Sequence, residues 1–329
     1  MSPEINPEME FQKKLHRMVK EQVVEGGVGA LPAKLILQTE LSWVSTVLQN
    51  TVTLQGMLES WMDNFRKNLD ESTKGLDISL LNGKGKDNDC IVIGAGPSVK
   101  SENLSLLKDF KGTIICVNKT FKPLLECEVY PDICLALHTT EEVEKQFDLE
   151  VQQGYYEKDR VAFILPSTIH PKVANRIIDD LGGNVFWFNP KVPEFNVENI
   201  NHFMEMMNQK PVLDTGGNVG IMAVVLAKLM GFKRVGLLGM EHCMTPSKDW
   251  SLEQALGYKY EFDPRDGDFY AIPPGFQVYL EALAAYIREM VADKVDVVNL
   301  TAKGPLYVRR DTVLRYQKME EFINETHIL

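Results

Sequence analysis

Residues 90–98 read CIVIGAGPS, an apolar run followed directly by a glycine-rich turn. A buried strand that leads into such a turn and then into a helix is typical of phosphate sites. Glycine lets backbone N–H groups approach a diphosphate, and a helix N-terminus adds unpaired donors. Pro97 suits the first position of that helix, and Ser98 adds a hydroxyl. The stretch therefore predicts a nucleotide-binding turn at Gly94, Ala95, Gly96, Pro97 and Ser98.

The turn differs from two well-known phosphate-binding patterns. It lacks the Lys-Ser/Thr ending of a Walker loop, and Val99 stands where a dinucleotide fingerprint has its third glycine. After the next apolar run, 113–117, Asn118 replaces the acid that dinucleotide enzymes use for ribose hydroxyls. Its amide can bond a ribose or a base edge, or cap a helix that begins near Lys119. A nicotinamide dehydrogenase is thus disfavoured, and a tight turn without a ligand stays open as the alternative for 94–98.

Composition restricts the class of protein. With 329 residues, of which 44% are hydrophobic, the chain can bury a sizeable core as one large domain with an appendage or as two domains. A net charge of -11 argues against sequence-independent binding to nucleic acid or to an anionic membrane. Five cysteines without CxxC spacing predict reduced thiols, and the absence of signal-peptide and membrane-span patterns leads us to expect a cytoplasmic protein. The scattered histidines form no zinc or EF-hand pattern, so we predict no structural metal.

Apolar periodicity gives the organisation of the chain. Helical spacing continues to about residue 70, and a polar boundary at 84–89 precedes short β-rich runs that alternate with helical ones. This pattern predicts an α/β fold with a Rossmann-like, mainly parallel sheet flanked by helices. We expect a helical N-terminal region at 1–82, a nucleotide-binding domain at 88–302 and a helical C-terminal tail at 303–329. The N-terminal helices pack on that domain or on a second copy, so a homo-oligomer stays open.

Individual elements follow from the same runs. The predicted strands are 90–93, 113–117, 133–137, 161–165, 185–188, 235–238 and 295–298, and the predicted helices include 171–181, 197–208, 218–230 and 277–291. Ligands of open parallel sheets bind beyond the carboxyl ends of the strands. That rule groups 94–98, Asn118, 138–140, 166–168 and 239–242 around one crevice.

A second glycine-rich turn precedes the apolar helix predicted at 218–230. It offers further N-terminal donors if it faces the same crevice. Its residues are Thr215, Gly216, Gly217 and Asn218.

Two histidines are candidates for acid–base chemistry. His242 follows Glu241 at the end of a predicted strand, and an imidazole beside a carboxylate can titrate near neutrality. His138 is the second candidate. The competing interpretation of each is a hydrogen-bonded structural histidine.

Four motifs in this order resemble a known superfamily. They are GAGPS at 94–98, CVNKTF at 116–121, TGG at 215–217 and GFKRVGLLGME at 231–241, with YPD at 130–132 before the third strand. Over 90–301 the chain resembles motility-associated-factor glycosyltransferases and bacterial sialyltransferases. The resemblance implies that 94–98 holds the phosphate and sugar of a nucleotide-activated donor. It also implies that Asn118 contacts the nucleotide and that 215–218 faces the transferred group.

The same wider group includes the archaeal, MptE-like 6-hydroxymethylpterin diphosphokinases. Those enzymes need acidic residues after the Pro-Asp strand to hold the magnesium of ATP, whereas this chain reads ALHTT at 136–140, with Glu141 and Glu142 nearby. The sialyltransferases place a histidine base before the helix that begins near Gln277, but 262–275 contains no histidine. The group usually carries Asp near the position of Glu241.

The function predicted from the sequence is a nucleotide-dependent transferase. Its first form is a glycosyltransferase with a nucleotide-activated sugar, for example a nonulosonic acid, as donor and a glycan, protein or pterin as acceptor. The alternatives are magnesium-dependent pyrophosphoryl transfer from ATP to a pterin, and a catalytically reduced nucleotide-binding or assembly protein.

Overall fold

The computed structural model describes residues 57–100, 102–147, 160–192, 199–244, 258–262, 269–301 and 314–325, together with Gly304 and Leu306. The helices predicted before residue 57 lie outside these residues. The same is true of most of the surface that the sequence suggests for a homo-oligomer.

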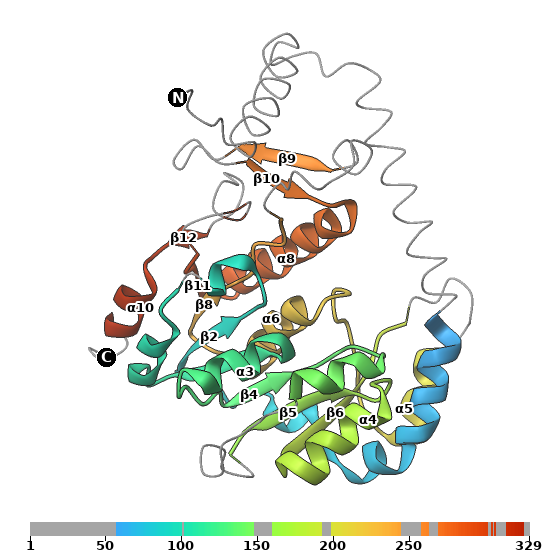
Figure 1. The fold of residues 1–329 in the computed structure, drawn as a ribbon. Helices are drawn as coiled ribbons and strands as arrows, with labels where there is room; N and C mark the ends of the chain where they lie inside the picture. The colour runs from blue at the N-terminus through green and yellow to red at the C-terminus, as the bar shows by residue number, and fades with distance from the viewer. Residues whose placement is uncertain are drawn as a thin grey trace, which may run out of the picture.

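A parallel sheet forms the centre of the molecule (Figure 1). Its strands lie in the order β1-β6-β5-β4-β3-β2-β8-β11-β12, β7 pairs with β6, and each of these strand pairs is parallel. The strands are β1 (Leu76–Asp77), β2 (Asp89–Ile93), β3 (Thr113–Val117), β4 (Ile133–Leu135), β5 (Ala162–Pro166), β6 (Asn184–Pro190), β7 (Val212–Leu213), β8 (Arg234–Leu238), β11 (Asp296–Asn299) and β12 (Arg315–Tyr316). An antiparallel pair, β9 (Lys259–Phe262) with β10 (Phe269–Ile272), stands apart from this sheet.

Helices cover both faces of the sheet, as the alternation of side chains along β2 requires. Cys90 and Val92 pack in the core under α6 (Val219–Met230) and α8 (Pro274–Ala292). Ile91 and Ile93 pack in the opposite core, with side chains of α3 (Asn118–Glu126), α4 (Pro171–Asn175) and α10 (Met319–Glu325). In Figure 1, α3 and α4 lie in front of the sheet and α6 behind it. This three-layer arrangement confirms the predicted α/β, Rossmann-like fold.

The strands and most of the helices predicted within 88–302 are confirmed, and the structure differs from the predictions in four places. The turn at 94–98 leads into η2 (Pro97–Lys100), a single 3-10 turn, instead of an α-helix. The helix predicted at 171–181 widens into a π-helical segment, η5 (Arg176–Leu181). Two stretches expected to be helical contribute the short strands β1 and β12. The other elements are η1 (Ile78–Leu81), η3 (Leu104–Asp109), η4 (Glu141–Phe147) and α5 (Ile200–Asn208). No helix of the described residues is long and apolar enough to cross a membrane.

The helix of residues 57–74 closes the carboxyl end of β5. In Figure 1 it is the blue helix beside α5, and its Phe65 packs with Ile200 and Met204 of α5. Its Asn64 amide donates to the carbonyls of Thr139 (3.0 Å) and Thr168 (3.1 Å). The amide of Asn68, one turn later, donates to the carbonyls of Ser167 (3.0 Å) and Ile169 (2.7 Å). These bonds tie the helix to the loops after β4 and β5.

Asn68→Ala is expected to lower the free energy of unfolding by about 1–3 kcal/mol, because it leaves buried carbonyls without donors. Chemical denaturation measures the change. Glu59→Ala, at an exposed position of the same helix, is the control and should stay within about 0.5 kcal/mol of the parent. Equal effects of the two substitutions would show that the Asn68 bonds contribute nothing.

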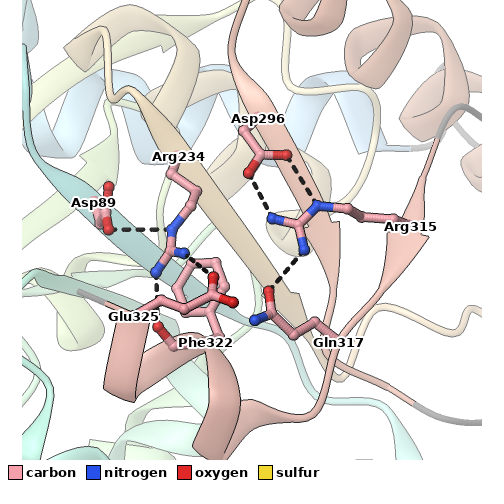
Figure 2. A network of polar contacts seen from close by, with 7 residues as sticks. All are labelled: Asp89, Arg234, Asp296, Arg315, Gln317, Phe322 and Glu325. Atoms are coloured by element: carbon pink, nitrogen blue, oxygen red, sulfur yellow. Dashed lines mark hydrogen bonds and ion pairs between the residues drawn. The ribbon is translucent and has the colours of Figure 1, made fainter. Parts of the chain in front are cut away.

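At the opposite, amino end of the sheet, Arg234 ties β8 to β2 and to α10 (Figure 2). Its guanidinium bonds the Asp89 carboxylate (Nε to Oδ2, 3.1 Å), the Glu325 carboxylate (2.7 Å) and the Phe322 carbonyl (2.7 Å). It also lies 3.9 Å from the centre of the Phe322 ring. Helix α10 is thus held against the central sheet.

Candidate functional site

The strand order changes direction beside β2. From β2 the chain adds β3, β4, β5 and β6 on one side, and then returns through α6 to place β8 on the other side. Such a switch point is where open α/β sheets bind ligands, beyond the carboxyl ends of the strands. The residues that follow β2 and β8 are 94–98 and 239–242, so the two predicted motifs lie next to each other.

The turn at 94–98 is bonded to the loop after β8. Gly94 N–H donates to the Leu238 carbonyl (2.8 Å), and Gly96 N–H donates to the Gly239 carbonyl (2.8 Å). Ser98 N–H donates to Glu241 Oε1 (2.9 Å). Three N–H groups of the predicted phosphate turn therefore already have protein acceptors. The four-residue η2 has no helix dipole of consequence to add.

Both glycines of the turn are required by close packing. A Cβ at Gly96 would lie 1.6 Å from Glu241 Oε2 and 2.8 Å from the Gly239 oxygen. A Cβ at Gly94 would lie 2.3 Å from the same backbone oxygen. The carboxylate of Glu241 thus lies directly over Gly96, where the glycine-rich sequence predicts a phosphate.

Glu241 is a buried carboxylate that is 4% exposed. Burial raises the pKa of its carboxyl group, and hydrogen bonds from Ser98 oppose part of that rise. Burial also raises the pKa of Glu102, and the negative charge of Glu241 raises it further, so the two carboxylates repel each other electrostatically. A carboxylate with a raised pKa holds a proton more strongly and is a better general base than a solvated one.

The side chain of His242 points to different neighbours from that of Glu241. The backbone of His242 is left-handed (φ 47°), and its ring contacts the rings of Phe276 (centroids 6.1 Å apart) and Tyr279 (6.0 Å). Burial lowers the pKa of the imidazole to about 4. The titration near neutrality expected from the Glu-His sequence is therefore wrong, and the His242 ring is neutral at pH 7.

The two glycine-rich turns converge. The Met240 sulfur lies 2.6 Å from where a Gly94 Cβ would be, and 3.1 Å from where a Gly220 Cβ would be. Asn218 caps α6, with its Oδ1 accepting from Gly220 N–H (2.8 Å). The turn at 215–218 therefore lies at the same edge of the sheet as 94–98.

Asn118 does not cap a helix. It is the first residue of α3, and its amide nitrogen donates to Gln146 Oε1 (2.5 Å). Its Oδ1 is buried without a hydrogen-bond partner. The capping interpretation of Asn118 is thus wrong, and its acceptor oxygen remains for another group.

Unpartnered polar atoms occur at the carboxyl ends of three strands of the sheet. Among the described residues, five buried side-chain polar atoms have no hydrogen-bond partner, and four of them follow or end the strands β3, β8 and β11. They are Asn118 Oδ1 after β3, Glu241 Oε2 and His242 Nε2 after β8, and Asn299 Nδ2 at the end of β11. Such atoms are rare in folded proteins and call for a partner. With neighbouring strands about 4.8 Å apart, β3 to β11 spans three spacings, about 14 Å.

The other predicted site residues lie elsewhere. His138 is exposed in the loop after β4, which is separated from β8 by β3 and β2, and the structure does not bring it to Glu241 or His242. Ser167 and Thr168 are buried, and their carbonyls accept from the helix of residues 57–74. This part of the edge is closed by protein.

Sequence reasoning missed Glu102, Asn299 and Thr301. The Thr301 hydroxyl lies 3.3 Å from Gly239 N and 3.4 Å from Ser98 Oγ, so the loop after β11 joins the site. The predicted strand 295–298 could have indicated Asn299 and Thr301, because ligands bind beyond the carboxyl ends of all strands of such a sheet. Within the described part of the chain, no group of three or more His, Cys, Asp or Glu side chains gathers as in a metal site.

Comparison with known proteins identifies a matching family and similar solved structures. The family model described as "6-hydroxymethylpterin diphosphokinase MptE-like" matches residues 60–247, a stretch that includes both glycine-rich turns and Glu241. The structure is similar to the MAf glycosyltransferase from Magnetospirillum magneticum AMB-1, with a TM-score of 0.53 and 13% sequence identity over 79% of this chain. The match covers 41% of that glycosyltransferase, so the likeness is one of fold. No curated protein matches the chain significantly.

Proposed function

The chain belongs to the MptE-like family of 6-hydroxymethylpterin diphosphokinase-like proteins, within a superfamily of transferases, and from this premise we propose that it transfers an activated group from a nucleotide to an acceptor hydroxyl. The observation that carries the proposal is the row of unpartnered polar atoms at the switch point. The row is about as long as a nucleotide, and it contains acceptors that ribose and base N–H or O–H groups satisfy.

In the proposed complex, Asn118 bonds the nucleoside, and the phosphate of the nucleotide lies against the turn at 94–98. Ser98 N–H now bonds Glu241, so a phosphate at this turn takes over that donor when Glu241 releases it. The released carboxylate then accepts the proton of the acceptor hydroxyl. The hydroxyl oxygen bonds to the transferred group, and the bond from that group to the nucleotide breaks with its electron pair on the phosphate.

Glycosyl transfer is the first candidate, because of the loop after β4. Residues 136–140 of this loop hold no carboxylate, and the nearby Glu141 forms an exposed ion pair with Lys172 of α4. The acidic positions that the diphosphokinases use for metal-bound ATP are thus not matched here. A nucleotide-activated sugar, for example a nonulosonic acid, is the proposed donor, and a small molecule, glycan or protein hydroxyl is the acceptor.

Pyrophosphoryl transfer from ATP to a pterin is the second candidate, favoured by the description of the matching family. The carboxylates of Glu102 and Glu241 are the groups that would hold a magnesium ion here, since Mg²⁺ takes one or two carboxylates together with substrate phosphates. Glu241 Oε2, buried and unpartnered, fits such a ligand. The ion would neutralise the charge of the phosphates.

A thermal-shift titration with CMP, CDP, UDP, GDP, AMP and ATP, each with magnesium or with EDTA, tests the proposal. A ligand at 100 times its Kd adds ~2.7 kcal/mol to the stability of the native state, which raises Tm by several degrees. Stabilisation by a cytidine or uridine nucleotide in EDTA is the expected result. Stabilisation by ATP with magnesium, together with AMP release in the presence of 6-hydroxymethylpterin, would favour the second candidate. No shift with any nucleotide would contradict both.

A further inference from the structure

Three aromatic rings lie together beside the switch point, and we call them the ring cluster: His242, Phe276 and Tyr279. His242 follows β8, and the other two come from the first turns of α8. Their ring centroids are 6.0–6.1 Å apart in all three pairs. Phe276 and Tyr279 are partly exposed, so the cluster presents aromatic surface and is not sealed in the core.

The ring cluster adjoins the second glycine-rich turn. A Cβ at Gly217 would lie 3.3 Å from Tyr279 Cε1, so the backbone at the start of α6 rests against that ring. Helices α6 and α8 pack against each other on this face of the sheet. The cluster therefore lies between the turn at 215–218 and the loop after β8, next to the row of unpartnered atoms.

The cluster also contains one polar atom without a partner. His242 Nε2 is buried and makes no hydrogen bond. Because the imidazole is neutral at pH 7, one of its nitrogens donates and the other accepts. A buried nitrogen of this kind costs stability until a donor or acceptor reaches it. A flat ring with nitrogen or oxygen atoms on its edge offers both a stacking face and that polar partner.

We propose that the ring cluster binds the heteroaromatic ring of the ligand, with the ring stacked on the aromatic side chains and its polar edge bonded to His242 Nε2. The inference deepens the proposed function and rests on it. A nucleobase and a pterin share this chemistry, and the experiment distinguishes them. Every base can stack on aromatic side chains, so stacking in this subsite selects heteroaromatic rings as a class. The hydrogen bond to the edge of the ring then distinguishes one heteroaromatic ring from another.

Titration calorimetry with small probes tests the proposal. The ring-bearing probes are cytidine, adenosine and 6-hydroxymethylpterin, and the ring-free probe is pyrophosphate. Tyr279→Leu removes the ring, and Tyr279→Phe is the matched control that keeps it. We expect Tyr279→Leu to weaken the best ring-bearing probe by roughly tenfold, Tyr279→Phe to stay within about twofold, and pyrophosphate affinity to be unchanged. Preference for a nucleoside or for the pterin identifies the source of the ring.

A second measurement is independent of any folding defect in a variant. In the wild-type protein the ring nitrogens of His242, assigned by their loss in His242→Asn, should shift in the NMR spectrum when a ring-bearing probe is added. Unchanged affinity in folded Tyr279→Leu, or a His242 spectrum indifferent to every probe, overturns the inference. If ring-bearing probes bind in a Tyr279-dependent manner but no nucleotide stabilises the protein, the ring subsite stands and the proposed function fails.

Discussion

Arg234→Met is expected to lower the free energy of unfolding by about 3–5 kcal/mol. The reason is the carboxylate of Asp89, which is 7% exposed and bonds the Arg234 guanidinium at 3.1 Å (Figure 2). Removing one partner of a buried pair leaves an uncompensated charge in a medium that solvates it poorly. The same substitution also frees the Phe322 carbonyl and the Glu325 carboxylate, through which α10 is held to β8.

Arg315→Met is the matched control, because Arg315 also forms an ion pair with an aspartate (Figure 2). Arg315 pairs with Asp296 at 2.7 Å, but both side chains are about half exposed, and exposed pairs contribute between zero and about 1 kcal/mol. Urea denaturation of the two variants measures the difference. Because Asp89 becomes the unpaired charge, Asp89→Asn added to Arg234→Met should recover part of the loss. A cost for Arg234→Met no larger than for Arg315→Met would contradict the buried-pair argument.

The backbone of the domain could be predicted from the sequence, because its strands are short runs of buried apolar residues. The carboxyl-end rule placed 94–98, Asn118 and 239–242 on one edge, and the parallel sheet brings them there. The polar contacts of the helix of residues 57–74 also had a pattern that could be recognised in the sequence. Asn64, Asn68 and Ser72 recur every four residues beside the apolar stripe of Trp61, Phe65 and Leu69, which puts polar groups next to the buried face.

The contacts of the site could not be predicted, because they join residues that are far apart in the sequence. Ser98 and Glu241 are 143 positions apart, and their bond exists because β8 returns to pair with β2 after five other strands have been added. Motif spacing does not contain that strand order. The environment of His242 depends on α8 in the same way. Its pKa was expected near neutrality because of the neighbouring Glu241, but burial lowers that pKa instead.

Gly96→Ala is expected to abolish measurable nucleotide stabilisation and to cost about 1–3 kcal/mol of folding free energy. The added methyl group would lie 1.6 Å from Glu241 Oε2, so the carboxylate or the whole turn has to move, and overpacking of a tight contact costs energy of this order. Thermal shift with and without the best nucleotide measures both effects. Gly275→Ala is the control, because nothing lies within 4 Å of its added Cβ, and it should remain within about 0.5 kcal/mol.

Combining Gly96→Ala with Glu241→Ala identifies the obstacle. If the carboxylate lies over Gly96, its removal makes room for the methyl group, and the double variant should be more stable than the two single changes predict by about 0.5–3 kcal/mol. The recovery should be incomplete, because the Gly239 oxygen lies 2.8 Å from the same Cβ position and, as a backbone atom, cannot be removed by a substitution. Strictly additive effects would mean that the Glu241 carboxylate does not occupy the space above Gly96. Loss of nucleotide binding in Glu241→Ala alone would show that Glu241 itself takes part in holding the ligand.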